Sequence, residues 1–286
     1  MTDPTETQRI AFQGELGANS HIACDQAYPS FTPLPCASFE DAFAAVSEGH
    51  ARYAMIPVEN SLFGRVADVH HLLPESGLYI VGERFVPIRH QLLGLPQATL
   101  EGLKAVRSHP QALGQCRKML RALGVAAVQT ADTAGAAREI AEIGDPSVGA
   151  LAPSLAGEIH GLKVLKADIA DAPHNTTRFL TFSRMPEFAA RGDRPCMTSF
   201  LFRVRNVPAA LYKALGGFAT NGVNMTKLES YIEGGAFAAA FFFSEVEGHP
   251  EEPALKNALE ELNFFSATLK IVGIYPADPF RRALRA

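Results

Sequence analysis

The chain has 286 residues, of which 47% are apolar and 20% charged, and its net charge is −4 at pH 7. This length fits two ordinary domains, and the apolar fraction is typical of globular proteins with substantial cores. A mildly acidic chain offers no basic field for nucleic acid, and no apolar run approaches the length of a membrane span. We therefore expect neither nucleic acid nor a membrane as a partner.

The start of the chain and its cysteines indicate the compartment. The first residues, MTDPTETQRI, lack the basic-then-apolar order of a signal peptide, so we expect a cytoplasmic protein. The four cysteines lie far apart and form no CxxC pair, which argues against disulfides and a zinc site. His70 and His71 would point about 100° apart on a helix, a poor geometry for one metal. We predict no metal.

The first part of the chain alternates strand and helix patterns. Residues 9–14 predict a strand, and a helix follows with Asn19 or Ser20 as its cap. Ser38 and Asp41 predict the start of a second helix that ends near Gly49. Strands are expected at 51–59 and 78–86, a strand, turn and helix at 105–124, and the same again at 145–161. This order predicts an α/β architecture with largely parallel strands.

Four polar segments come where strands are expected to end: QGELGANS (13–20), PVENS (57–61), SHPQ (108–111) and APHNTTRF (172–179). Ligands of α/β folds gather at the carboxyl ends of the strands. We therefore predict that these segments converge on one site.

The pattern changes after residues 183–196, which are rich in proline, glycine and charge and predict a domain boundary. Two strand–helix–strand patterns then follow. Their expected core positions are Phe200, Phe202 and Val204 on a strand, Leu211, Leu215 and Phe218 on a helix, and Leu255, Leu259 and Leu262 on a second helix. We place Pro208 at the start of the first helix and Asn221–Gly222 at its end. The order β-α-β-β-α-β is that of the ferredoxin-like fold.

Six segments together resemble the monofunctional bacterial prephenate dehydratases, which carry a catalytic domain followed by an ACT regulatory domain. The segments are AFQGELGANSH, IPVENSLFGRV, SHPQALGQC, HNTTRF, RNVPAALYKAL and MTKLESY, in family order. The resemblance implies a polar tail at 1–8 and a two-lobed, periplasmic-binding-protein-like catalytic domain at 9–183. It further implies a linker at 184–196, an ACT domain at 197–276 and a tail at 277–286.

The family's reaction converts prephenate to phenylpyruvate with loss of water and carbon dioxide, and it needs no cofactor. The dianionic substrate requires guanidinium and amide donors, an apolar wall for the ring and help for the departing hydroxyl. The catalytic residues implied by the resemblance are Thr177, Arg178 and Phe179, and Glu59 joins them as a carboxyl that could serve as the acid. Those expected to bind substrate are Ser20, Asn60, Ser61, Ser108, His109, Gln111, Asn175 and Thr176.

Two questions stay open at the triplet Thr177–Phe179. A threonine hydroxyl is a very weak acid, so Thr177 is a better hydrogen-bond donor than proton donor, and Glu59 and His109 are the other candidates for the proton. In a regular strand, Thr177 and Phe179 would share a face and Arg178 would point away. We therefore expect a loop or the lip of a strand; otherwise Arg178 is structural.

The resemblance also implies feedback inhibition by phenylalanine, bound between paired ACT domains of a homodimer or homotetramer. The residues expected to bind it are Pro208, Ala209, Ala210, Leu211, Asn224, Met225, Leu228, Glu229 and Ser230. Two features depart from the family pattern. Ala209 stands where the family has glycine, and Tyr231 and Ile232 stand where it has arginine and proline.

Two alternatives stand beside a prephenate dehydratase. An arogenate dehydratase would act on a substrate with an amine in place of the keto group. A catalytically inactive small-molecule sensor would be expected to have lost the polar segments, yet ENS, HPQ and NTTRF are all present.

Overall fold

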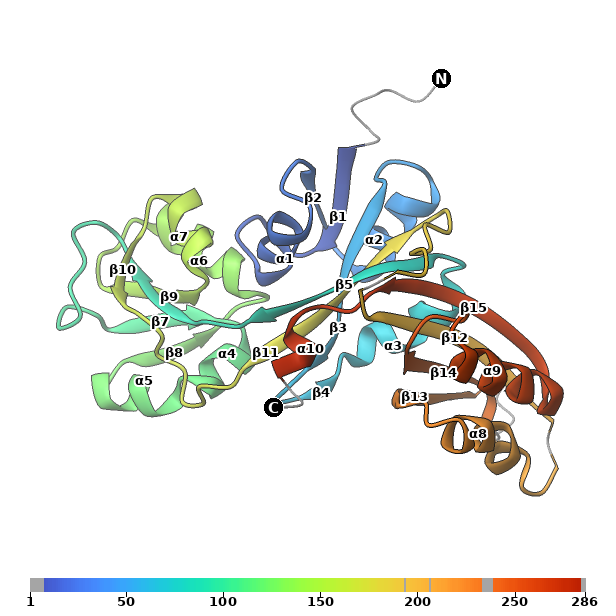
Figure 1. The fold of residues 1–286 in the computed structure, drawn as a ribbon. Coiled ribbons are helices and arrows are strands. Elements are labelled where there is room, and N and C mark those ends of the chain that lie inside the picture. Colours follow the sequence, from blue (N-terminus) through green and yellow to red (C-terminus); the bar gives the residue numbers. More distant parts are fainter. Residues whose placement is uncertain (1–7, 193, 206, 233–238, 284–286) are drawn as a thin grey trace. The chain divides into compact units, whose positions relative to one another are not determined.

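The structure is a computed structural model that describes residues 8–192, 194–205, 207–232 and 239–283 (Figure 1). The chain divides into two compact units. Unit 1 contains residues 1–66 and 84–179, and unit 2 contains residues 67–83 and 180–286. The limits of the units fall inside strands β5 (Tyr79–Pro87) and β11 (Thr176–Ser183). The domain limits expected from the sequence stay a prediction.

The first sheet of unit 1 carries its strands in the order β11, β3, β1, β2, with β4 paired to β3. The elements are β1 (Arg9–Gln13), α1 (Asn19–Ala27), β2 (Thr32–Cys36), α2 (Phe39–Ser47), β3 (Tyr53–Asn60) and β4 (Gly64–Arg65). Strand β1 pairs in parallel with β2 and with β3. The parallel arrangement brings the carboxyl ends of these three strands to one edge of the sheet.

The second sheet of unit 1 has the order β10, β6, β9, β7, β8. Its elements are β6 (Gln91–Gly94), β7 (Ala105–Ser108), α4 (Pro110–Gln115), α5 (Arg117–Leu123), β8 (Ala126–Gln129), α6 (Thr133–Ile143), β9 (Val148–Ala152), α7 (Ser154–His160) and β10 (Lys163–Lys166). Strand β7 is parallel to β8 and β9, whereas β6 is antiparallel to β9 and β10. The predicted α/β architecture is confirmed, but the pairing is mixed and not largely parallel, since the second sheet has two parallel and two antiparallel pairs.

Helix starts in unit 1 test the capping predictions. Ser38 and Asp41 form a reciprocal capping box at α2, as predicted. The prediction for α1 was wrong, because its N-cap is Ala18 and not Asn19 or Ser20. Tertiary packing fixes this turn instead: Gly17 has φ +92°, and a Cβ on it would lie 2.6 Å from the Cα of Ala156.

The helix predicted after SHPQ is interrupted. It ends at Gln115 and restarts at Arg117, with Cys116 between them at φ −113° and ψ 19°. Leu113, Cys116 and Leu120, which recur at helical spacing, nevertheless belong to one buried cluster.

Two short segments connect the sheets of unit 1: residues 88–90 lead from β5 to β6, and residues 167–175 lead from β10 to β11. They are hydrogen-bonded to each other. Ile88 N donates to Asn175 O at 2.7 Å, and Ile169 N donates to His90 O at 3.0 Å. The two connecting segments thus run together between the sheets.

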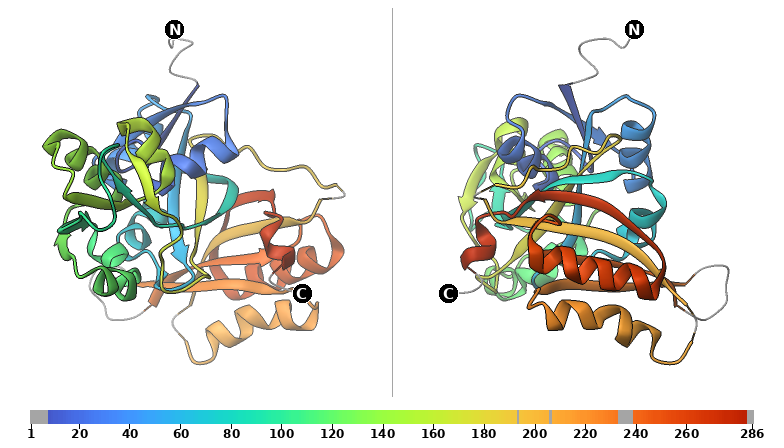
Figure 2. Two further views of the ribbon diagram at one scale, coloured as in Figure 1. Left: turned by 90° about the vertical axis from the view of Figure 1, so that its left-hand side faces the viewer. Right: turned by 45° about the vertical axis from the view of Figure 1, so that its right-hand side comes forward.

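Unit 2 contains α3 (Ala67–Glu75) and then the predicted order β-α-β-β-α-β. These elements are β12 (Cys196–Val204), α8 (Ala210–Thr220), β13 (Met225–Ile232), β14 (Ala239–Glu247), α9 (Pro253–Phe265) and β15 (Ser266–Pro276), followed by α10 (Phe280–Ala283). The sheet order is β13, β14, β12, β15, and each neighbouring pair is antiparallel. This is the ferredoxin-like arrangement. Figure 2 shows α8 and α9 lying along one face of this sheet.

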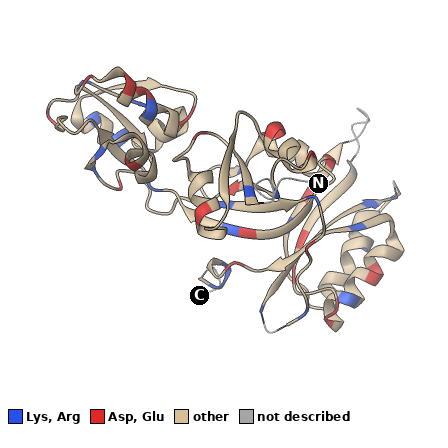
Figure 3. Cartoon of the chain, turned by 90° about the horizontal axis from the view of Figure 1, so that it is seen from above, with Lys and Arg blue, Asp and Glu red and all other residues tan. Residues whose placement is uncertain are grey.

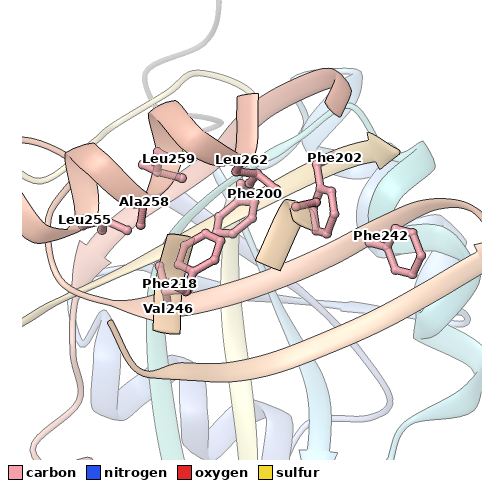
Figure 4. Packing of buried hydrophobic residues seen from close by; sticks show 10 residues of the cluster. Phe200, Phe202, Phe218, Phe242, Val246, Leu255, Ala258, Leu259 and Leu262 are labelled. Carbon is pink, nitrogen blue, oxygen red and sulfur yellow. The ribbon is translucent and has the colours of Figure 1, made fainter. Parts of the chain in front are cut away.

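The core of unit 2 lies between the sheet and these two helices (Figure 4). All the core positions predicted for the two helices and for β12 belong to this cluster. The rings of Phe200 and Phe218 are stacked, with centroids 5.8 Å apart. Burying a phenylalanine side chain contributes about 1.5–3 kcal/mol, so this cluster is the main reason why the unit folds as predicted.

Two details of unit 2 differ from expectation. Helix α8 begins at Ala210 with Ala209 as its N-cap, so Pro208 precedes the helix by two residues. The C-terminal segment is not a plain tail, because α10 is held by Arg281. Its guanidinium makes two hydrogen bonds to the buried Glu83 carboxylate, at 2.6 and 2.8 Å. Residues 233–238, between β13 and β14, lie outside the described residues.

Charged residues are distributed over both units. In Figure 3, basic and acidic residues are interspersed along the helices and strands. Among the residues that the structure describes, no helix combines the length and the apolar character needed to cross a bilayer.

Candidate active site

The polar segments predicted to converge lie in unit 1. Three of them lie at the carboxyl ends of β1, β3 and β7, with PVENS forming the last residues of β3 itself. The fourth does not follow a strand, because β11 begins at Thr176, inside HNTTRF. Contacts pair Ser61 with Thr176 and Asn60 with Thr177, which is antiparallel register. The start of an antiparallel strand lies beside the carboxyl end of its neighbour, so the segment still joins this edge.

Asn60, the last residue of β3, is the centre of the hydrogen bonding. Its Oδ1 accepts from the backbone N–H groups of Leu62 at 2.9 Å and Phe63 at 3.2 Å. Its Nδ2 donates to Asn175 Oδ1 at 2.8 Å and to Thr177 Oγ1 at 2.9 Å. Two acceptor and two donor positions are the full capacity of an amide side chain. The orientation of Asn60 is therefore fixed.

The bond from Asn60 determines what the Thr177 hydroxyl can do. Thr177 Oγ1 acts as the acceptor in that bond, because Asn60 Nδ2 has only hydrogens to offer. The hydroxyl hydrogen of Thr177 is then available for a bond to another acceptor. A buried threonine held in this way is a hydrogen-bond donor of fixed position, which suits a group that recognises a departing hydroxyl.

The hydrogen bonding extends from Asn175 into the second sheet. Asn175 Nδ2 donates to Gln115 Oε1 at 2.8 Å, and the same oxygen lies 2.6 Å from His90 Nε2. Neither Gln115 nor His90 was among the residues predicted from the sequence. Gln115 could have been found, since it ends α4 inside the family segment SHPQALGQC. His90 precedes a buried strand and gave no motif signal.

Glu59 and Arg178 form an ion pair beside this network. Arg178 Nη1 donates to Glu59 Oε2 at 3.1 Å; the Arg178 side chain is 5% exposed and that of Glu59 37%. The guanidinium carbon also lies 5.9 Å from the centroid of the Phe85 ring. One carboxylate oxygen of Glu59 is thus engaged by Arg178.

The triplet Thr177–Phe179 lies at the start of β11, so of the two expected placements it has the lip of a strand and not a loop. Alternation along the strand then directs Thr177 and Phe179 to one face and Arg178 to the other. Glu59 and Asn60 alternate in the same way on β3, which matches the two separate pairs that they form. Phe179 is 1% exposed, and its contact with a substrate ring stays a prediction.

Ser61 and Thr176 tie the two strands together. Ser61 N donates to Thr176 O, and Ser61 Oγ accepts from Thr176 N, both at 2.9 Å. Ser61 Oγ also donates to His174 O at 2.9 Å. These bonds hold the start of β11 against the end of β3, and so they position Asn60 and Thr177.

The other predicted residues of this region are placed as follows. Ser108 is fully buried and donates to Leu151 O at 2.7 Å, so it does not cap α4. His109 is the cap, with Nδ1 accepting from Gln111 N at 3.3 Å. The Gln111 side chain is exposed, and Ser20 is a buried residue near the start of α1. Their part in binding stays a prediction.

Among the described residues, no cluster of three or more histidine, cysteine or acidic side chains is arranged to hold a metal. The buried thiols are far from reactive: burial raises the pKa of Cys116 to about 12, with the Asp171 carboxylate adding to the shift. His90 differs, because burial lowers its pKa.

The residues predicted to bind phenylalanine lie at the start of α8 and along β13. Ala209 has φ +61°, a conformation that glycine adopts without strain. On β13, Leu228 and Ser230 are exposed, whereas Glu229 alternates to the other face and pairs with Lys227 at 2.7 Å. The expected residues of β13 are thus divided between two faces.

Unit 2 also contains a cavity of about 410 Å³ at the end of the sheet where β12 begins. Of the residues predicted to bind phenylalanine, Asn224 lines it. Its wall further includes Met197, Leu255, Asp278 and Arg281. The cavity therefore lies apart from the Pro208–Leu211 turn, at the opposite end of β12.

Comparisons with known proteins agree with this fold and site. A family model described as prephenate dehydratase matches residues 10–187. A bifunctional N-acyl-homoserine lactone acylase/prephenate dehydratase of Komagataeibacter europaeus is 52% identical over 96% of this chain and 97% of its own length. Arogenate dehydratase/prephenate dehydratase 1 of Arabidopsis thaliana is 37% identical, covering 96% of this chain and 73% of its own.

A solved structure extends the likeness to three dimensions. Prephenate dehydratase from Arthrobacter aurescens in complex with L-Phe has a TM-score of 0.84 and 28% identity, covering 97% of both chains. The fold is thus that of an α/β enzyme with a lobed first domain followed by a smaller ferredoxin-like one. The chain belongs to the prephenate dehydratase family.

Proposed function

We propose that this protein is a dehydratase that converts prephenate to phenylpyruvate, releasing water and carbon dioxide. The substrate loses its ring hydroxyl and its ring carboxylate, and the ring becomes aromatic. Aromatisation drives the reaction, so the protein has to bind two carboxylates, align the ring and assist the hydroxyl as it leaves. Membership of the family and the hydrogen bonding of Thr177 support the proposal.

In this proposal the Thr177 hydroxyl donates a hydrogen bond to the oxygen that leaves as hydroxide when the ring carboxylate departs as carbon dioxide, and the hydroxide takes its proton from solvent to become water. The supporting observation is the bond in which Asn60 donates to Thr177 Oγ1. Because Thr177 is the acceptor in that bond, its own hydroxyl hydrogen can be donated to the substrate. A neutral hydroxyl donor stabilises charge that develops on the leaving oxygen without having to ionise. The role needs a hydrogen bond only, which agrees with the weak acidity of threonine.

Arg178 and Glu59 would supply the charge on the other side of β11. Because Arg178 lies on the face opposite Thr177, it would support the site through its ion pair with Glu59, which links β11 to β3, and not by contact with the substrate beside Thr177. Asn175 and the neighbouring polar residues complete substrate binding. The set proposed to do so is Ser20, Asn60, Ser61, Ser108, His109, Gln111 and Thr176, with Phe179 supporting the ring.

The test is direct. Purified protein is incubated with prephenate, and phenylpyruvate is followed by its absorbance. Turnover is expected without added metal or cofactor. A protein that leaves prephenate unchanged would overturn the proposal and favour the sensor alternative.

Arogenate is the second substrate to measure, because relatives from Arabidopsis and Petunia bear the name arogenate dehydratase. It differs from prephenate by an amine in place of the keto group. We propose prephenate as the preferred substrate. A kcat/KM for arogenate above that for prephenate would reverse the assignment while leaving the chemistry intact.

A second candidate activity is hydrolysis of N-acyl-homoserine lactones. The relative from Komagataeibacter europaeus carries both activities in its name and is similar over nearly the whole of this chain. Release of homoserine lactone from an N-acyl substrate, measured by chromatography, tests this. If the same residues serve both reactions, Thr177→Ala lowers both rates; a separate site would leave acylase activity intact.

We further propose that phenylalanine inhibits the enzyme through a regulatory ACT domain spanning residues 197–276, joined by the 184–196 linker to a catalytic domain at 9–183. The L-Phe complex of the Arthrobacter protein supports this. Binding would involve residues 208–211, 224, 225 and 228–230 in a homodimer or homotetramer. Inhibition curves, with the oligomer measured by light scattering, test both parts; turnover that phenylalanine leaves unchanged rejects only the regulation.

A further inference from the structure

His90 is a buried histidine at the junction between the two sheets of unit 1. It is 3% exposed and immediately precedes β6, and its backbone oxygen accepts from Ile169 N. Its Nε2 lies 2.6 Å from Gln115 Oε1. In the part of the chain that the structure describes, its Nδ1 is a buried atom with no hydrogen-bond partner.

The direction of every bond between His90 and Thr177 follows from two backbone groups. The N–H groups of Leu62 and Phe63 can only donate, so they identify the oxygen of the Asn60 amide, and Asn60 Nδ2 is the donor. The atom of Asn175 that receives this bond must be its oxygen, and its nitrogen then donates onward.

Gln115 and His90 complete the series. Because Asn175 Nδ2 donates, the Gln115 atom that receives it must be Oε1. The same oxygen faces His90 Nε2, which must then donate as well. His90 Nε2 therefore carries a hydrogen, and the partnerless Nδ1 is the deprotonated nitrogen of a neutral ring. A second proton on Nδ1 would be a buried donor without an acceptor, which is costly.

We propose that His90 is a positioning residue for the dehydration reaction: its Nε2–H anchors the far end of the Gln115–Asn175–Asn60 series that holds Thr177 as a donor. The inference rests on the proposed role of Thr177. His90 itself is separated from Thr177 by three side chains and does not touch the substrate. Burial lowers its pKa, which agrees with a ring that stays neutral.

The tautomer can be measured without any assay of activity. In protein labelled with ¹⁵N at histidine, the two ring nitrogens of a neutral imidazole have widely separated shifts. We expect His90 to show protonated Nε2 and bare Nδ1 at pH 7, and His90→Phe identifies its signals. Protonation at Nδ1, or at both nitrogens, would overturn the inference.

Kinetics of matched variants test the positioning role. His90→Phe keeps a ring but removes the donor, and we expect kcat to fall about tenfold with little change in KM, as for a reacting group that is misplaced. His90→Gln can still donate through its own Nε2, and it should restore most of kcat. His249→Phe is the control: His249 is buried in unit 2, with Nε2 3.0 Å from Ala189 O.

The outcomes separate this inference from the proposed function. His249→Phe should lower the melting temperature about as much as His90→Phe while leaving kcat unchanged. If the wild type turns over prephenate and His90→Phe retains full kcat, His90 has no positioning role although the function stands. If the wild type does not act on prephenate, the function fails, and the tautomer still reports whether the hydrogen bonding is as described.

Discussion

The family segments of unit 1 and those of unit 2 differ in how far their residues are engaged with one another. Around Asn60, buried polar side chains are hydrogen-bonded in a single series from Thr177 to His90. Along β13 and at the start of α8, residues such as Pro208, Leu228 and Ser230 are exposed. Lys227 and Glu229 of β13 form an ion pair on the opposite face.

This difference separates two ways of building a site. The first region is preorganised: its donors and acceptors are oriented before a ligand arrives, which is what a reaction with developing charge requires. The second presents a surface, in keeping with the proposal that phenylalanine binds between paired domains. Variants in the region around Asn60 should therefore alter kcat, and variants in β13 or at the start of α8 should alter regulation and assembly.

The largest effect is expected at Thr177. Thr177→Ala removes the proposed donor, and kcat should fall by about 10²–10³, as when one preorganised donor is removed, with KM nearly unchanged. Thr177→Ser keeps the hydroxyl and should retain most activity. Thr198→Ala is the control, since Thr198 is a buried threonine of unit 2 that donates to Gly248 O at 2.7 Å. A near-normal kcat in Thr177→Ala would show that the orientation of the Thr177 hydroxyl does not contribute to the reaction, and the contrast between the two regions would fail.

The Glu59–Arg178 pair should show an asymmetry. Glu59→Gln leaves the buried guanidinium without its carboxylate partner and should lower the free energy of unfolding by about 3 kcal/mol. Arg178→Met leaves a carboxylate that water reaches, so a loss of about 2 kcal/mol is expected. Urea unfolding measures both. Equal losses of the free energy of unfolding in the two variants would mean that the burial of Arg178 does not determine the contribution of the ion pair to stability.

Ala209→Gly tests the second region. Alanine at φ +61° is strained, and the substitution should raise the free energy of unfolding of this region by about 1 kcal/mol. The same change restores the family's glycine, so inhibition by phenylalanine should become tighter. Ala219→Gly is the control, because Ala219 lies within α8, where glycine destabilises the helix. A loss of stability in Ala209→Gly would contradict the strain.

The smallest effect concerns acid. Arg138 makes two hydrogen bonds to the Glu15 carboxylate, at 2.9 and 3.0 Å, and these bonds lower the pKa of Glu15. A carboxyl with a lowered folded-state pKa stabilises the protein above its unfolded pKa of about 4.3, and the contribution is lost as pH falls through the folded value. Glu15→Gln should therefore lose less stability than the wild type between about pH 5 and pH 3 in urea titrations. Parallel curves would show that the pair contributes nothing.

The sequence predicted the framework well where one local signal acts alone. Apolar periodicity identified the core of unit 2, and the Ser38–Asp41 capping box was read correctly. The prediction from sequence misplaced the cap of α1, because the close approach of Gly17 to Ala156 is a tertiary constraint that local patterns do not contain. It also missed the break at Cys116, a residue of the buried cluster.

The site was predicted only in part, because local sequence signals identify its segments while tertiary contacts determine how they meet. Segments carried Asn60, Asn175 and Thr177, which the structure joins by hydrogen bonds. The directions of these hydrogen bonds could not be predicted, because they depend on β11 starting at this edge of the sheet, antiparallel to β3. The alternation of apolar and polar residues does not distinguish the start of a strand from its end. His90 was invisible, since a single buried histidine has no spacing to recognise it by.

The connecting segments of unit 1 have a mechanical consequence. The chain passes between its two sheets only at residues 88–90 and 167–175, and these segments carry His90 and Asn175. A rotation of one sheet against the other would bend both segments at once. Gln115 is hydrogen-bonded to one residue of each segment, Asn175 and His90, so the same rotation would strain both of its bonds.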